Sequence, residues 1–206
     1  MNIFFKKKEK KNKLFFFIFN SAIGEPFRIE KYDNNGEEKK IEFFSLEKSK
    51  YSNYFLEMKQ YVIWSILGNV CRVFIQDSYY KEFKILYQKE INVLYIEFLE
   101  NILKRSYEIS KKNNFYFFSI IFLSYLFSFF LSYKFILENF FFFYFLFTFI
   151  LIFSFLFLNI KQKKNLKNYK QKKFEEMIRK VKLFLGEENF SNVIEKQKEY
   201  FSKLKI

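Results

Sequence analysis

Two long uncharged stretches constrain this chain more than any other feature of its sequence. Residues 115–133 and 139–160 contain no charged side chain and consist mostly of Phe, Leu, Ile and Tyr. A bilayer core about 30 Å thick is crossed by roughly 20 helical residues, and backbone within lipid must satisfy its own hydrogen bonds. The two stretches therefore predict membrane-spanning helices, with a pair of buried core helices as the alternative.

Residues 134–138 are the only connection between the two stretches, so we expect an antiparallel helical hairpin with both chain ends on one side. Basic residues flank the hairpin on that side, which by the positive-inside rule is the bacterial cytoplasm or the mitochondrial matrix. Those before the first stretch are Lys104, Arg105, Lys111 and Lys112, and those after the second are Lys161, Lys163, Lys164, Lys167, Lys170, Lys172 and Lys173.

The seven lysines after the second stretch are predicted to fix the orientation of the chain and to contact membrane lipids. Anionic headgroups, such as those of cardiolipin, are the partners that a juxtamembrane basic cluster attracts. Because orientation and lipid contact account for these residues, nucleic acid is not expected as a partner.

Three serines recur at four-residue spacing in the first stretch, at Ser124, Ser128 and Ser132. This spacing places small hydroxyl side chains on one face of a helix, where they allow a second helix to approach closely. We interpret them as a helix-packing face, with chance as the alternative in a chain that has few other small residues.

The composition removes most catalytic and metal chemistry. The chain has no His, a single Cys (Cys71) and a net charge of +14. Zinc sites, His-based haem sites and Ser-His or Cys-His nucleophiles all need residues that are missing. Neither apolar stretch carries an ionisable residue of the kind that proton and ion pathways use. We therefore expect a non-catalytic protein without a cofactor.

The N-terminal part, residues 1–44, combines a basic segment with signals for a small β-hairpin. Residues 14–19 form a short apolar run, interpreted as a strand or an interfacial anchor rather than a cleaved signal peptide. Residues 27–32 and 39–43 alternate in polarity on either side of an Asn-Gly pair, which is a hairpin signal.

Residues 45–114 are predicted as amphipathic helices on the matrix side. Residues 61–75 are almost entirely apolar and are read as a buried or interfacial helix, with a break at Asp77 and Ser78 as an N-cap. The helix that follows is expected to continue into the first apolar stretch as one rod. Residues 161–206 are predicted as basic C-terminal helices, with Gly186 ending the first of them. The predicted fold is mainly α, with the transmembrane hairpin at 115–160.

In its dominance by Phe, Lys, Ile, Asn and Tyr, and in the run NFFFFYFLFTFILIFSFLFLNI that begins at Asn139, the chain resembles the unassigned open reading frames of ciliate mitochondrial genomes. Many such proteins are similar to fast-diverging subunits of oxidative-phosphorylation complexes. The resemblance implies an inner-membrane protein with both termini in the matrix, partnered by other subunits of a membrane complex.

The sequence thus predicts a non-catalytic accessory subunit, of cytochrome c oxidase first and of complex I or ATP synthase next. One alternative is an oligomeric membrane transport or translocation component. Another is a bacterial or endosymbiont membrane protein. The layout also looks like the mitochondrial calcium uniporter, but the acidic pore motif of that family is absent at the turn, where Glu138-Asn139-Phe140 stands instead.

Overall fold

A computed structural model describes residues 18–34, 36–134 and 140–203, and the chain divides into two compact units. The sheet unit comprises the residues up to 96 together with those from 185 onward, and the hairpin unit comprises residues 97–184.

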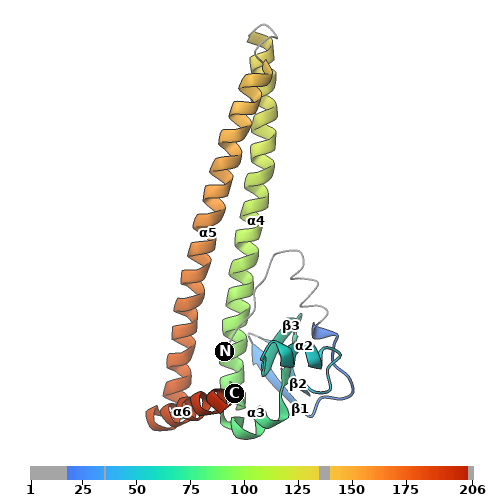
Figure 1. Ribbon diagram of the computed structural model, residues 1–206, viewed down its shortest axis with the longest axis vertical. Helices are drawn as coiled ribbons and strands as arrows, with labels where there is room; N and C mark the ends of the chain where they lie inside the picture. The colour runs from blue at the N-terminus through green and yellow to red at the C-terminus, as the bar shows by residue number, and fades with distance from the viewer. Residues whose placement is uncertain (1–17, 35, 135–139, 204–206) are drawn as a thin grey trace. The chain divides into compact units, whose positions relative to one another are not determined.

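The sheet unit is built on four strands (Figure 1). In space their order is β1-β2-β4-β3, with antiparallel pairing at both edges and a parallel pair, β2 and β4, in the middle. The sheet is therefore two β-hairpins joined side by side. The strands are β1 (Arg28–Asn34), β2 (Glu37–Ser45), β3 (Val62–Leu67) and β4 (Val70–Ile75).

Helices and loops cover both faces of this sheet. On one face Phe44 and Phe74 pack with Ile18, with Leu46 and with Phe55 of α2 (Ser52–Glu57). The other face carries Phe43 and Val73, both fully buried, and lies against α3 and the start of α4. The remaining elements of this unit are α3 (Asp77–Glu82), the 3-10 turn η1 (Lys84–Tyr87), the beginning of α4 (Lys89–Lys134) and α6 (Glu187–Lys203).

The first predicted β-hairpin is confirmed. Arg28 pairs with Phe43 and Asn34 with Glu37, and the turn between the strands contains Gly36 at φ +82°. Its amide donates to the Asp33 carboxylate over 2.8 Å, which closes the turn. Positive φ is the conformation for which glycine is favoured in tight hairpin turns.

The prediction of a mainly α fold is wrong, because residues 61–75 form a second β-hairpin, β3–β4, rather than a helix. Strands covered on both faces are apolar at nearly every position, so their sequences lose the alternation that marks a strand. Gly68, at φ +57°, lies in the turn between them.

The hairpin unit consists of the rest of α4 and most of α5 (Phe140–Leu185), running antiparallel (Figure 1). The pairing of residues between α4 and α5 keeps the same register along the hairpin unit. Contacts join Phe98 to Phe174 and Phe127 to Phe147, with ring centroids 6.0 Å and 4.1 Å apart, and between these two levels Asn113 bonds Asn159. The prediction that one rod continues through Lys111 and Lys112 is confirmed by α4.

The predicted transmembrane hairpin is also wrong. Over the part of the chain that the structure describes, no helix is both long enough and apolar enough to cross a membrane. The two apolar stretches lie within α4 and α5, and each helix continues into turns that carry Lys, Arg and Glu side chains.

Some sequence predictions concern residues outside the described ones. The basic segment 1–13 and most of the apolar run 14–19 are among them, as is the turn at 135–138. Ile18 and Phe19, which are described, are both buried.

Two predictions about helix ends have different outcomes. The predicted end of α5 at Gly186 is confirmed, since this glycine has φ +80° between Leu185 and Glu187. The predicted N-cap at Ser78 is wrong, because α3 begins at Asp77 after Gln76 and the Ser78 hydroxyl lies 3.0 Å from the Tyr200 hydroxyl of α6.

Candidate functional site

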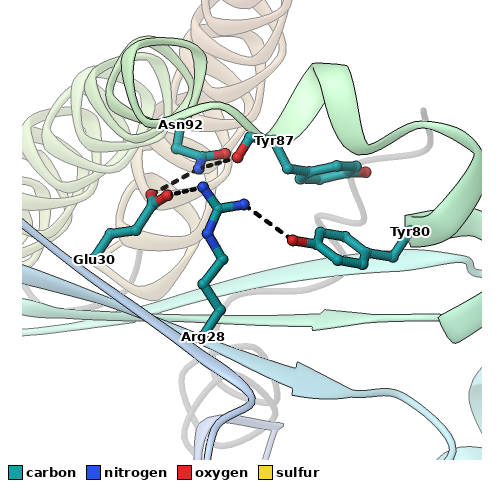
Figure 2. Close-up of polar contacts among 5 residues, drawn as sticks. All are labelled: Arg28, Glu30, Tyr80, Tyr87 and Asn92. Atoms are coloured by element: carbon teal, nitrogen blue, oxygen red, sulfur yellow. Dashed lines mark hydrogen bonds and ion pairs between the residues drawn. The ribbon is translucent and has the colours of Figure 1, made fainter.

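A buried polar network connects the sheet to the start of α4 (Figure 2). Strand β1 places Arg28 and Glu30 on the same face, and their side chains form an ion pair. Arg28 also donates to the Tyr80 hydroxyl of α3 over 3.0 Å. The Asn92 amide of α4 donates to the other Glu30 oxygen over 2.8 Å and to the Tyr87 carbonyl over 2.9 Å.

This network holds the start of α4 against the sheet. Asn92 is fully buried, and Glu30 is 9% exposed with partners on both of its carboxylate oxygens. Buried polar groups are costly unless they are hydrogen-bonded, so the network favours one placement of α4 against the sheet. The carbonyl oxygen of the Asn92 side chain is buried and has no hydrogen-bond partner.

A second network lies on the opposite face of the sheet, around Arg72 of β4. Its guanidinium donates to Glu42 over 2.9 Å and to the Phe19 carbonyl over 2.8 Å, and it lies 4.1 Å from the centre of the Phe19 ring. Lys40 pairs with the other Glu42 oxygen. Burial raises the pKa of Glu42, but bonds from Lys40 and Arg72 outweigh it and hold that pKa below its ordinary value.

Several tyrosines between the sheet and the helices remain uncharged at physiological pH. Burial raises the pKa of Tyr95 to about 12 and the pKa values of Tyr79 and Tyr87 well above their ordinary range. The Tyr79 hydroxyl accepts a hydrogen bond from Gln197 of α6 over 2.7 Å. Tyr79 packs α3 against Tyr200 and Phe201 of α6, and Tyr95 stacks on Trp64 of β3. The raised pKa values of the three tyrosines make them poor proton acceptors or nucleophiles.

The predicted helix-packing serines are only partly described. Ser124 is 4% exposed on α4, and its hydroxyl donates to the Ile120 carbonyl one turn earlier, over 2.8 Å. Its burial among exposed neighbours is the behaviour expected of a packing position. Ser128 and Ser132 lie on the same helix, but their side chains are outside the described set.

The predicted basic residues of α5 form part of a larger surface. Lys161, Lys163, Lys164, Lys167 and Lys172 are exposed, whereas Lys170 and Lys173 are half-buried. In the antiparallel register the first part of this segment, as far as Tyr169, lies opposite residues 104–112 of α4. The combined surface, here called the cationic band, consists of Lys104, Arg105, Lys111, Lys112, Lys161, Lys163, Lys164, Lys167, Lys170, Lys172 and Lys173.

Acidic groups neutralise little of this band. Within residues 104–112 and 161–173 the sequence has eleven Lys and Arg and one acidic residue, Glu108. Glu108 pairs with Arg105 over 3.0 Å, and Lys173 pairs with Glu176 over 2.6 Å. The Arg105 guanidinium also lies 5.9 Å from the centre of the Tyr169 ring on the opposite helix. The band has a positive surface, given by exposed lysines that include Lys111, Lys112, Lys161, Lys163, Lys164 and Lys167.

A polar contact that sequence reasoning missed lies at the edge of the band. Asn113 donates to the Asn159 side chain over 2.8 Å across the two helices, and the side-chain oxygen of nearby Gln162 is buried without a hydrogen-bond partner. Two isolated Asn residues separated by 46 positions give no sequence signal until the helix register is known. A buried polar pair of this kind can set the register of a helical seam.

Beyond Asn113 and Asn159, apolar side chains point outward from both helices. Phe115, Phe118 and Tyr125 on α4 and Phe149 and Phe157 on α5 are each about two-thirds exposed. Monomeric soluble proteins rarely expose contiguous apolar patches larger than a few hundred Å², and larger patches mark interaction sites.

By its architecture the chain is an α+β protein with one sheet unit and one helical-hairpin unit. Among the described residues, no group of three or more Cys, Asp or Glu side chains is placed to hold a metal ion. Comparisons with models of known families, with curated protein sequences and with solved structures find no match.

Proposed function

We propose that this chain is a non-catalytic accessory subunit of an oxidative-phosphorylation complex of the mitochondrial inner membrane. Cytochrome c oxidase is the first choice, followed by complex I and ATP synthase. The observation that carries the proposal is the apolar surface of the hairpin unit farther from Asn113 and Asn159, which includes Tyr125, Phe149 and Phe153. Such a surface is stable when apolar partner surfaces cover it.

The polar networks of the sheet unit support a structural role. Among the described residues of the sheet unit, Glu30 and Glu42 are the buried acidic side chains. Arg28, Asn92, Arg72 and Lys40 hold them by hydrogen bonds and ion pairs. A carboxylate engaged on both oxygens is poorly placed to move a proton to or from a substrate. In this reading the sheet unit is a folded module that the subunit contributes to its complex.

The test is to extract native membranes with a mild detergent, separate the complexes by native electrophoresis and identify by mass spectrometry the band that holds this chain. Co-migration with the subunits of one respiratory complex or of ATP synthase is expected. Migration alone would contradict the proposal, and migration as a homo-oligomer would favour a transport or translocation component instead.

A further inference from the structure

The cationic band ends at the same level on both helices of the hairpin unit. On α4 the last cation of the band is Lys112, directly before Asn113, and on α5 the first cation is Lys161, shortly after Asn159. The 2.8 Å bond between Asn113 and Asn159 places these two boundaries side by side. A positive zone and an apolar zone therefore meet along one line across the unit.

Beyond that line exposed apolar side chains are frequent, whereas the band itself carries Tyr107 as its exposed aromatic residue. Phe115 and Phe118 on α4 are 70% and 68% exposed, and Phe157 and Ile160 on α5 are each 65% exposed. A ligand that matches both zones offers apolar surface at this level and negative charge at the level of the adjoining band. A phospholipid with an anionic headgroup has both features in one molecule.

We infer that the cationic band binds the headgroups of anionic phospholipids, with acyl chains against the adjoining Phe and Ile side chains. A nucleic acid would match the charge of the band but would leave the aliphatic side chains of Ile160, of Leu156 one turn earlier on α5 and of Ile121 on α4 exposed to water. Charge and apolar surface together therefore favour the lipid. The inference does not depend on which complex the chain joins, because the purified chain suffices to test it.

The experiment measures binding of the full-length chain to vesicles by flotation. One set of vesicles contains phosphatidylcholine alone, and the other also contains phosphatidylglycerol. The test variant replaces two exposed lysines on each helix of the band, Lys111, Lys112, Lys161 and Lys164, by Gln. The matched control makes the same change of charge at four exposed lysines of the sheet unit, Lys48, Lys50, Lys81 and Lys84.

The natural chain is expected to prefer the anionic vesicles, with affinity that falls as salt is raised. Each lysine near an anionic surface contributes roughly fivefold in affinity, so the test variant should lose about 100-fold or more after screening. The control should stay within about threefold of the natural chain, because its lysines lie in the sheet unit, outside the band.

Three results would overturn the inference. One is equal binding of the natural chain to neutral and anionic vesicles. Another is an equal loss of affinity in the test variant and the control, which would mean that net charge alone decides. The third is tighter binding to duplex RNA than to anionic vesicles with the same loss in the test variant, which would assign the band to nucleic acid. The native-electrophoresis result is independent of all three.

Discussion

Asn92 provides the sharpest test of how the sheet unit is held together. Its amide makes one hydrogen bond to the Glu30 carboxylate and one to the Tyr87 carbonyl. A bond to a charged group contributes about 2 kcal/mol and a neutral one about 1 kcal/mol, while removal of the unpartnered side-chain oxygen returns about 1 kcal/mol. Asn92→Ala should therefore lower the free energy of unfolding by about 2 kcal/mol.

Asn92→Asp should be more damaging at neutral pH, because it places a second carboxylate beside Glu30. Two like charges about 4 Å apart repel by about 4 kcal/mol at an effective dielectric constant of about 20. Repulsion and burial raise the folded-state pKa of the new carboxyl above its unfolded value. The loss of stability is therefore full above that folded pKa and declines as pH falls through it, so about 2 kcal/mol should return between pH 7 and pH 5.

Urea unfolding followed by the fluorescence of Trp64 measures both variants. Trp64 is the only tryptophan of the chain and stacks on Tyr95 of α4, with ring centroids 5.5 Å apart. The chain has no His, so the natural protein has little background titration in this range. Unfolding of Asn92→Ala like that of the natural chain, or equal stability of Asn92→Asp at both pH values, would show that Asn92 does not stabilise the sheet unit through Glu30.

Three further predictions concern other parts of the chain. Arg72→Met should cost about 2 kcal/mol at pH 7 through its lost bonds to Glu42 and the backbone. The folded-state pKa of Glu42 lies below its unfolded value of 4.5, so Glu42 stabilises the fold above pH 4.5 and that stability is lost as pH falls through the folded pKa. Acid unfolding should therefore become less steep in this variant. An unchanged acid transition would count against the pairing of Arg72 with Glu42. Gly186→Ala should lower stability by about 1 kcal/mol in thermal unfolding, because the position has φ +80°, and no change would contradict the strain. Asn113→Leu should lower the free energy of unfolding by about 1 kcal/mol, because it leaves Asn159 without its hydrogen-bond partner. Adding Asn159→Leu should recover this stability, whereas additive losses in the double variant would show that the two side chains do not interact.

The sequence signals that predicted structure correctly were local ones. The Asn-Gly pair between two alternating segments predicts β1 and β2, and the helical pattern after Asp77 predicts one rod through Lys111 and Lys112. The rod begins later than predicted, because α3 and η1 precede α4, which starts at Lys89. The β3–β4 hairpin was not predicted, because both its faces are covered and its strands are apolar without alternation. The remaining sequence signal was the Gly68-Asn69 pair at the turn. A strand buried on both sides and a buried helix look alike in periodicity.

The candidate surfaces depended on contacts that are distant in sequence. Asn92 lies 62 residues from Glu30, and neither residue carries a signal that relates it to the other. The antiparallel hairpin predicted from the sequence already places the lysines of α5 at the same end as Lys111 and Lys112. Which residues of the two helices lie opposite one another was known only from the register that Asn113 and Asn159 define.

Cross-linking mass spectrometry on native mitochondrial membranes tests the central claim most directly, because a lysine-reactive reagent samples the exposed cations of the hairpin unit in place. If the chain is an accessory subunit, Lys111, Lys112, Lys161 and Lys163 should form cross-links to polypeptides of one oxidative-phosphorylation complex. Cross-links confined to this chain, or to further copies of it, would contradict that role.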